Sequence, residues 1–377
     1  MDRVYFDYNA TTPVAPEVAS AMRPFLDQQF GNPSSLHWAG ERVRAAVGCA
    51  RRQVARLLHC NPAELVFTSG GTEANNFALT GVFFGYQGKV SPHFIISSVE
   101  HPSVAKTCDF LQRLGAQVTQ VPVDRFGQVD PDAVQRAIRP NTALVSVMHA
   151  NNEVGTIQPI EQIASIAREH DVLLHSDAAQ TIGKLPVSVN DLGVDLLTVA
   201  GHKMYAPQGV GALFIRGGVL LEPWLHGAGH EDGRRAGTEN VSGIVALGAA
   251  SELAERQMDV AAMSDVRDHF WARLREKFGA NVVLNGHPDR RLPNTLNVSF
   301  LNHHGQEILT RISGLAASTG SACHAGSHQI SPVLSAMGVS EPVGLGAIRF
   351  SLGRTSTYEE VEAIVGQLTK VLFNTVT

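Results

Sequence analysis

The chain has 377 residues, of which 44% are hydrophobic and 17% are charged, and these values favour a globular protein of two domains with a large core. Its net charge of −5, without a long run of either sign, argues against nucleic acid or an anionic membrane as a partner and leaves small molecules as the default substrate. No stretch approaches the roughly 20 apolar residues of a membrane span, and the start is not of signal-peptide type, so we expect a cytoplasmic location.

The first 40 residues are rich in turn formers, in the segments DYNATTP and GNPSS. They predict an extended arm with one helix near residues 16–28, and such arms often lie across a neighbouring domain or subunit. Apolar residues at helical spacing then predict a helix over residues 41–58.

Short apolar runs and helical patterns alternate after residue 65, which predicts the βαβ order of a largely parallel sheet covered on both faces. The expected strands are residues 65–68, 94–97, 117–123, 143–149, 172–176, 194–199 and 210–215. The expected helices are residues 73–84, 103–114, 132–138 and 159–170. In such sheets ligands bind beyond the carboxyl ends of the strands, so loops at those ends are the first place to look for a site.

A long helix near residues 242–258 leads out of this unit, and the pattern then changes. One further helix, strands near 282–284, 295–300 and 347–352, and helices at 306–312 and 358–373 predict a smaller α+β domain. We therefore expect a large domain over residues 16–258 and a small domain made of residues 1–15 and 259–377.

Two neighbouring strand ends are expected to bring an acid and a lysine together. One strand delivers Asp177 and Gln180 to a loop, and the next delivers Gly201-His202-Lys203. Either residue alone is more often a loop cap or a surface lysine. Together they suit pyridoxal phosphate, whose aldehyde needs an amine for a Schiff base and whose ring nitrogen needs a carboxylate.

Three other strand ends carry polar residues of the same kind. The segment TSGGTEANN places Gly71 and Thr72 between a strand and a helix, where backbone N–H groups can bind phosphate. His101 can lie on a cofactor ring or be an ordinary loop histidine. Asn152 can donate a hydrogen bond to a ligand or simply form a turn.

Ordered motifs over nearly the whole chain resemble the NifS/IscS-type cysteine desulfurases, which are fold-type I, class V aminotransferase-like enzymes that use pyridoxal 5'-phosphate. The motifs are FDYNATTP, GNPSS, TSGGTE, VEHPS, MHANNEVG, DAAQ, GHK, GTEN, SACHAG and RFSLGR. The resemblance implies an α/β fold with a seven-stranded, mainly parallel sheet in the large domain, and a homodimer.

The same resemblance implies a role for each matching residue. Lys203 carries the cofactor as a Schiff base, Asp177 pairs with its ring nitrogen, and His101 stacks on its ring. Further contacts to the cofactor are implied for Gly71, Thr72, Asn152, Gln180, His202 and, across the dimer interface, Thr238. One position departs from the family, because Ala200 stands where bacterial desulfurases usually have a serine that binds the phosphate.

Cys49, Cys60, Cys108 and Cys323 include no CxxC pair, which argues against a disulfide framework or a structural zinc site, and we expect no metal. Cys323 lies in the small, polar segment TGSACHAGSHQ, which lacks the apolar neighbours of a buried thiol and contains two histidines. The resemblance makes Cys323 the residue that receives the sulfur. Arg349 offers a planar fork for a substrate carboxylate, which the resemblance assigns to Arg349 rather than Arg354, with Asn152 beside it.

The resulting hypothesis is an enzyme that converts L-cysteine to L-alanine and passes the sulfur, as a persulfide on Cys323, to an acceptor protein. A selenocysteine lyase acting on L-selenocysteine is the alternative, because SPHFIISSVEH, Ala200 and the SACHAG segment resemble that branch. An aminotransferase would not require a cysteine at residue 323. A non-catalytic scaffold would not need to keep Lys203, and an oxidoreductase of the Rossmann type lacks its GxGxxG after the first strand.

Overall fold

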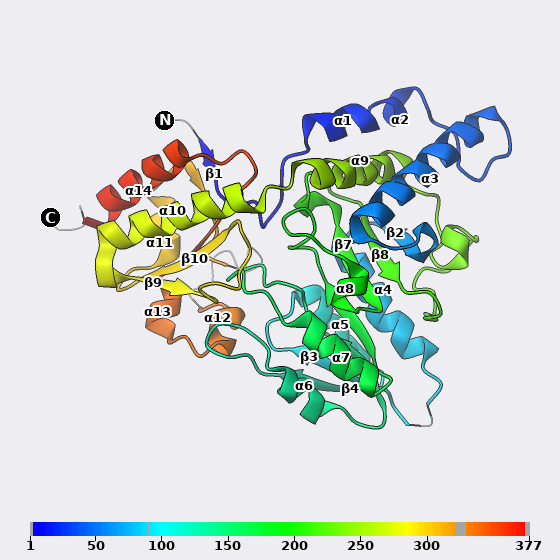
Figure 1. The fold of residues 1–377 in the computed structure, drawn as a ribbon, viewed down its shortest axis with the longest axis horizontal. Helices are drawn as coiled ribbons and strands as arrows, with labels where there is room; N and C mark the ends of the chain where they lie inside the picture. Colours follow the sequence, from blue (N-terminus) through cyan, green and yellow to red (C-terminus); the bar gives the residue numbers. More distant parts are fainter. Residues whose placement is uncertain (1–2, 89, 321–328, 374–377) are drawn as a thin grey trace.

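The computed structural model describes residues 3–88, 90–320 and 329–373, and it has two lobes (Figure 1). The large lobe is built on a seven-stranded sheet with the strand order β2-β8-β7-β6-β5-β3-β4. Its strands are β2 (Leu65–Thr68), β3 (His93–Ser97), β4 (Gln117–Val121), β5 (Thr142–Ser146), β6 (Leu173–Asp177), β7 (Leu196–Ala200) and β8 (Gly211–Ile215). Among these strands β8 alone is antiparallel to its neighbours. The predicted α/β fold with a mainly parallel sheet is confirmed.

Helices cover both faces of this sheet. They are α3 (Trp38–Leu58), α4 (Gly71–Gly85), α5 (Pro102–Arg113), α6 (Pro131–Ala137), α7 (Ile160–Glu169), α8 (Val189–Leu192) and α9 (Val241–Gln257), with 3₁₀ turns η1 (Pro62–Glu64), η2 (Gly201–Lys203) and η3 (Glu231–Gly233). Successive residues of β2 enter different cores, because Leu65 and Phe67 pack on one face and Val66 on the other. A sheet buried on both faces explains why most of its strands read as continuous apolar runs, whereas the edge strand β4 is partly exposed and alternates with polar residues.

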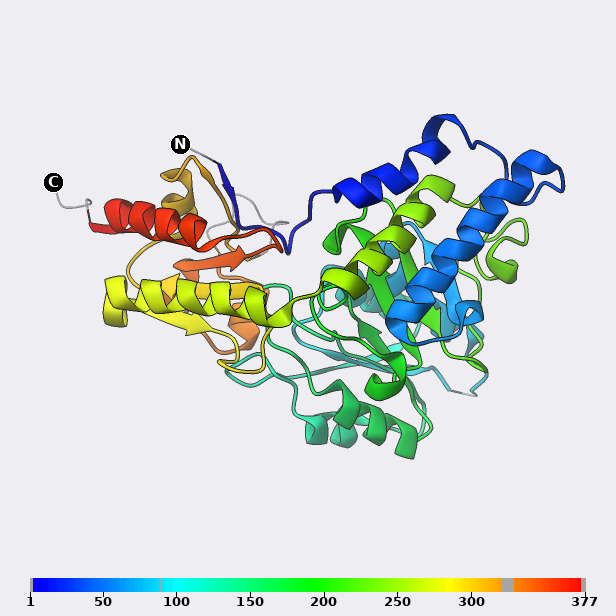
Figure 2. The same ribbon diagram turned by 45° about the horizontal axis from the view of Figure 1, so that its top comes forward.

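The small lobe has a three-stranded antiparallel sheet in the order β12-β10-β9. Its elements are α10 (Val260–Phe278), η4 (Gly279–Asn281), β9 (Val282–Asn285), β10 (Thr295–Phe300), α11 (Gly305–Thr310), α12 (Pro332–Ala336), α13 (Glu341–Leu345), β12 (Ala347–Ser351) and α14 (Tyr358–Phe373). Helices α10 and α14 lie side by side over this sheet (Figure 2). The sequence pattern did not predict α12 or α13, because each is a single turn or little more.

The N-terminal arm connects the two lobes. Strand β1 (Val4–Tyr5) pairs in parallel with β11 (Leu315–Ala316), and Phe6 enters the small-lobe core. The chain then crosses to the large lobe, where Ala15 joins the core of that lobe (Figure 2). The N-terminal segment therefore runs from one lobe to the other, as expected for an extended arm. The residue limits that we assigned to the two domains stay a prediction.

The single arm helix that we expected over residues 16–28 is wrong. The structure has two short helices, α1 (Pro16–Met22) and α2 (Pro24–Asp27). Pro24 has no N–H to continue the first helix and takes the first position of the second, so it divides the segment. In the described part of the chain, no helix is both long and apolar enough to cross a membrane.

Candidate active site

Lys203 lies at the carboxyl end of β7, in the turn η2. Its Nζ donates hydrogen bonds to the carbonyl oxygens of Asn9 (2.6 Å) and Ala10 (2.7 Å), both in the arm. Burial, followed by the charge of Arg349, lowers the pKa of Lys203 to about 8, although two nearby carboxylates act in the opposite direction. The amine is therefore much closer to its neutral, nucleophilic form than an exposed lysine.

Asp177 is the last residue of β6, and it pairs in register with Thr198 of β7, so its strand end adjoins the one that leads to Lys203. Its carboxylate is buried and accepts hydrogen bonds from Asn75 Nδ2 (2.7 Å) and the Ala179 N–H (2.9 Å). Within residues 3–88, 90–320 and 329–373, no cationic side chain forms an ion pair with Asp177. A buried acid with donors but no cation leaves room for a cationic ligand group.

His101 caps the N-terminus of α5, and its ring is held in one tautomer. Nδ1 accepts the Ser103 N–H (3.1 Å) and lies 2.7 Å from Ser103 Oγ, which in turn accepts from Asn75 Nδ2 (2.8 Å). Nδ1 is an acceptor, so in the neutral ring the hydrogen is on Nε2. Burial lowers the pKa of His101, with the Asp177 carboxylate opposing this effect. A continuous network therefore connects Asp177, Asn75, Ser103 and His101.

The N-terminus of α4 lies beside the end of β7. Gly70 precedes the helix at a φ of 145°, and a Cβ placed on Gly71 would lie 3.2 Å from Ala200 Cβ. The first N–H groups of a helix lack partners within the helix, so this end is suited to an anion. Thr72 follows in the first turn with an exposed side chain, as a phosphate ligand would require.

The loop that carries Thr238 is attached to the same helix end. Glu73 of α4 forms an ion pair with Arg235 of the loop, with contacts of 2.8 and 3.2 Å. Thr238 is exposed. Its expected contact with the cofactor of a second subunit stays a prediction.

His202 precedes Lys203, and its Nδ1 lies 3.1 Å from the Thr11 hydroxyl of the arm. Burial, with the charges of Lys203 and Lys184, lowers the pKa of His202 to about 4. His202 is therefore neutral near pH 7 and can bind a phosphate by hydrogen bonding but not as a cation.

Gln180, Lys184 and Asn9 form a second network that the sequence did not reveal. Lys184 Nζ donates to Gln180 Oε1 (2.8 Å) and Asn9 Oδ1 (3.0 Å), and Gln180 Nε2 donates to the Asn9 carbonyl (3.0 Å). Burial, together with Lys203 and Arg349, lowers the pKa of Lys184 well below its ordinary value. Lys184 thus fixes the orientation of the Gln180 amide, with its NH₂ group available as a donor.

Arg349 is 2% exposed and extends from β12 of the small lobe. It donates from Nη1 to the Asn152 carbonyl (2.9 Å) and from Nη2 to Asp7 Oδ1 (2.7 Å), whereas Nε has no partner among the described residues. Arg354 stacks on Tyr205 instead, at 4.8 Å from the ring centroid. Arg349 is buried beside the arm, which suits a residue that binds a carboxylate ligand. The position of Arg354 on Tyr205 does not suit this role.

Cys323 lies outside the described residues, as do residues 321–328 generally. The described chain leading to this segment is attached to the site, because the backbone of Ser318 exchanges hydrogen bonds with that of Arg349 (2.7 and 3.2 Å). Gly320 lies against Glu153, because a Cβ placed on Gly320 would be 2.5 Å from the carboxyl carbon of Glu153. Burial raises the pKa of Glu153 to about 7. The described chain before this segment, at Ser318 and Gly320, therefore lies close to Arg349 and Glu153.

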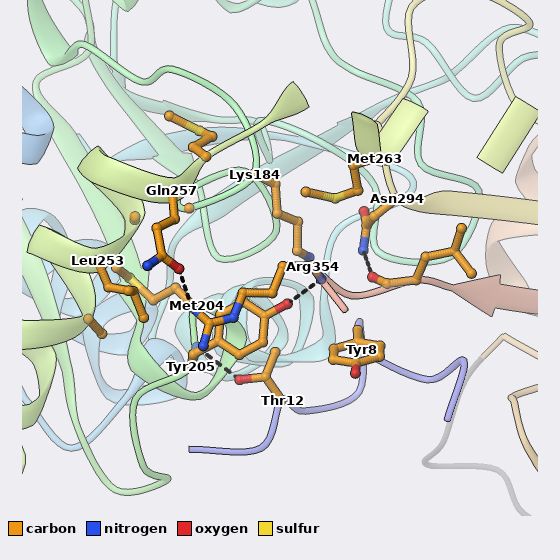
Figure 3. Close-up of a pocket in the computed structure, with 15 residues that line it drawn as sticks. Tyr8, Thr12, Lys184, Met204, Tyr205, Leu253, Gln257, Met263, Asn294 and Arg354 are labelled. Atoms are coloured by element: carbon orange, nitrogen blue, oxygen red, sulfur yellow. Dashed lines mark hydrogen bonds between the residues drawn. The ribbon is translucent and has the colours of Figure 1, made fainter. Parts of the chain in front are cut away.

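A small cavity of about 30 Å³ lies between the lobes, and Lys184 is one of the residues that line it (Figure 3). Tyr8, Met204, Tyr205 and Leu253 are among the mostly apolar residues that surround it. This volume has room for one or two water molecules, so it cannot hold an amino acid. The polar side chains gathered at the strand ends around Lys203 are the candidate site instead. Across the described ranges, no group of three or more metal-ligating side chains is found.

Comparisons with known proteins agree on one family. Residues 4–364 match the family described as aminotransferase class-V. The chain is 47% identical over 373 residues to a protein named cysteine desulfurase IscS from Dictyoglomus turgidum, which covers 98% of this chain and 94% of that protein. A solved structure of a NifS-like protein has a TM-score of 0.92 and 37% identity, over 99% of this chain and 100% of the other. Another, described as SspA in complex with cysteine, has a TM-score of 0.83 and 38% identity, over 94% and 99%.

Proposed function

Because the chain belongs to the class-V aminotransferase family, we propose that the residues gathered around Lys203 desulfurate L-cysteine. The activity is that of a pyridoxal-phosphate-dependent cysteine desulfurase, which forms L-alanine and transfers the sulfur. The names of the relatives favour this activity over the selenocysteine lyase considered from the sequence. The assignment of roles to individual residues is our proposal.

The described residues fit the cofactor chemically. Asp177 is a buried carboxylate without a cationic partner, which suits a protonated ring nitrogen. Lys203 has an amine with a lowered pKa, and the α4 N-terminus at Gly71 has free N–H groups for a phosphate. We propose that Thr72 and His202 also hold the phosphate, and that His101, Asn152 and Gln180 contact the ring and its oxygen.

Arg349 is proposed to bind the substrate carboxylate and Lys203 to move the proton of the substrate Cα. The bound cofactor supplies an electron sink for the carbon that loses this proton. Arg349 and Lys203 come from different lobes, yet both bond the arm between Asp7 and Ala10. This shared attachment is the observation that carries the proposal, because it brings a carboxylate clamp and an amine base to the same place.

Cys323 is proposed to take the sulfur. Its thiolate forms an S–S bond with the substrate sulfur while the substrate C–S bond breaks, and the electron pair of that bond stays on the three-carbon product, which takes up a proton to become L-alanine. The persulfide on Cys323 then passes its outer sulfur to an acceptor protein.

A homodimer is also proposed, and the exposed apolar side chains of the arm support it. Leu26 of α2, Phe30, Leu36 and Trp38 at the start of α3 are 64%, 78%, 86% and 69% exposed. Four exposed large apolar side chains within 13 consecutive residues favour a protein interface on this segment. In this dimer Thr238 would contact the cofactor of the partner subunit. A cytoplasmic location remains a prediction from the sequence.

The decisive experiment substitutes Cys323. Cys323→Ala should lose nearly all L-alanine formation from L-cysteine while the visible absorption of the bound cofactor stays unchanged. The wild-type protein, mixed with L-cysteine and a thiol-trapping reagent, should carry one extra sulfur on the peptide that contains Cys323, as measured by mass spectrometry. Wild-type turnover in Cys323→Ala, without trapped persulfide on the wild-type protein, would exclude the covalent mechanism. Comparing kcat/KM for L-cysteine and L-selenocysteine tests the lyase alternative.

A further inference from the structure

Asp7 forms an ion pair with Arg349, the residue whose guanidinium group binds the substrate carboxylate in our proposal. Asp7 Oδ1 accepts from Arg349 Nη2 at 2.7 Å, and the Asp7 side chain is 19% exposed whereas that of Arg349 is 3% exposed. A buried guanidinium without a counter-ion is costly, so a carboxylate is needed there whether or not a substrate is bound. In the described residues, Asp7 is the only carboxylate that forms an ion pair with Arg349.

Asp7 also begins a turn that continues to the atoms that bind Lys203. The Ala10 N–H donates to the Asp7 carbonyl at 2.9 Å, which closes a four-residue turn over residues 7–10, here called the arm turn. The hydroxyl of Tyr5 donates to the same Asp7 carbonyl (3.2 Å). The carbonyls of Asn9 and Ala10, at the other end of the arm turn, accept from Lys203. The arm turn therefore contacts the substrate clamp at one end and the catalytic lysine at the other.

We propose that Asp7 is an internal stand-in for the substrate carboxylate, which pairs with Arg349 in the free enzyme and is displaced when the substrate binds. This inference rests on the proposed role of Arg349. Asp7 is then a positioning residue that sets substrate affinity, because every carboxylate that binds must compete with it. The 19% exposure of the Asp7 side chain is compatible with such movement, since displaced Asp7 can be hydrated.

A purely structural role of Asp7 predicts the opposite sign. If Asp7 only held Arg349 in place, its loss would let the guanidinium move and would weaken the binding of a carboxylate. If Asp7 competes, its loss strengthens that binding. The direction of the change in affinity therefore separates the two roles.

The test uses the holoenzyme with Asp7→Asn, which keeps the shape and removes the charge. L-Alanine and ethylamine are a matched pair of ligands, because ethylamine is alanine without the carboxylate, and both are titrated by the change in visible absorption of the cofactor. We expect the Kd of L-alanine to fall about threefold to thirtyfold, the range of a partly buried charged pair, and that of ethylamine to stay within twofold. The KM for L-cysteine should fall in parallel, without a rise in kcat.

Three controls make the outcome decisive. Asp109→Asn removes an exposed aspartate that pairs with Lys106, and it should change neither Kd. Asp7→Glu restores the charge and should return the L-alanine Kd toward the wild-type value. In an Arg349→Ala background, Asp7→Asn should have no effect, because the competition has been removed.

An L-alanine Kd that rises or does not change in Asp7→Asn overturns the proposal. If both Asp7→Asn and Asp7→Glu fail to fold, as judged by circular dichroism, it is also overturned, because a group that a ligand displaces cannot be what holds the fold. If Arg349→Ala leaves the preference for L-alanine over ethylamine intact, the proposed function of Arg349 fails instead, independently of Asp7.

Discussion

The two sides of the site are built differently. On one side, a continuous hydrogen-bond network within the large lobe is formed by Asp177, Asn75, Ser103 and His101. On the other side, Arg349 comes from the small lobe, Asp7 from the arm, and the Asn152 carbonyl from a loop of the large lobe. From their proposed roles, we call these the cofactor side and the substrate side.

Because of this difference, we expect the cofactor side to be rigid and the substrate side to change its contacts when a ligand binds. The cofactor side keeps its contacts however the lobes move, so its geometry is set before any ligand binds. The substrate side depends on three chain segments, and movement of the small lobe would break its contacts. Asn9 connects the two lobes, because its side chain accepts hydrogen bonds from Lys184 of the large lobe and Asn294 of the small lobe.

Lys203→Ala is expected to have the largest effect, because in the proposed function Lys203 acts on both cofactor and substrate. Its loss removes both the covalent attachment and the base, so turnover should fall by at least about 10³-fold. The cofactor's visible absorption band should change in position, and L-alanine formation should be undetectable, while circular dichroism shows an intact fold. Retention of both the band and activity would contradict the assignment.

Arg349→Ala should act mainly on the substrate side, although removal of its charge also lets the pKa of Lys203 rise. Loss of a charge-assisted, bidentate contact lowers kcat/KM for L-cysteine by about tenfold to a hundredfold, mainly through KM. Arg349→Lys should recover little, because an ammonium lacks the planar fork. Steady-state kinetics and the absorbance of the bound cofactor check this. An unchanged KM would mean that another residue binds the substrate carboxylate. Arg349 would then not belong to a substrate side.

Asn75→Ala should affect the cofactor side alone, and by a smaller amount. Asp177 would lose one of two donors and Ser103 a donor to its hydroxyl. A lost hydrogen bond to a charged group costs about 1.5–3 kcal/mol, so the cofactor Kd should rise about tenfold or more, with little change in the KM for L-cysteine once the enzyme is saturated with cofactor. Equilibrium titration of the protein with the cofactor measures the cofactor Kd. A raised KM with an unchanged cofactor Kd would show that the two sides are not separable.

The same comparison explains which features the sequence could predict. Cofactor-side residues such as Asp177 and His101 follow apolar strands of a parallel sheet, and the carboxyl ends of such strands meet, so local patterns were enough to bring them together. The cysteine segment and Arg349 were also singled out, but by resemblance and residue type rather than by position. The predicted roles of these residues remain proposals.

Arg349 and Asn152 of the substrate side were named from the sequence, but their contacts with each other and with Asp7 were missed because these residues are distant in sequence. Asp7 and Arg349 are 342 residues apart, and Asn9 and Lys203 are 194 apart. The motif containing Asp7 and Asn9 was recognised as a turn-rich arm and as part of the family resemblance, but neither residue was given a role. Lys184 follows Gln180 by four residues in a loop, where no periodic pattern marks it as buried. Burial of such polar groups depends on how the lobes pack, which strand and helix periodicities do not encode.

Ala200→Ser is expected to have the smallest effect, and it tests how complete the cofactor side is. Ala200 ends β7 and is 5% exposed, and its Cβ would be 3.2 Å from a Cβ on Gly71. A hydroxyl at residue 200 can therefore lie beside the first turn of α4, where the proposed phosphate site has free N–H groups.

One additional hydrogen bond to the phosphate contributes about 1 kcal/mol, so Ala200→Ser should lower the cofactor Kd about fivefold relative to the present protein. Ala200→Cys, of similar size but with a weak donor, is the matched control and should gain little. Because the change lies on the cofactor side, the KM for L-cysteine should stay the same in all three proteins. Equal cofactor dissociation constants for the alanine and serine forms would mean that another group already satisfies the phosphate, so that the missing serine costs this enzyme nothing.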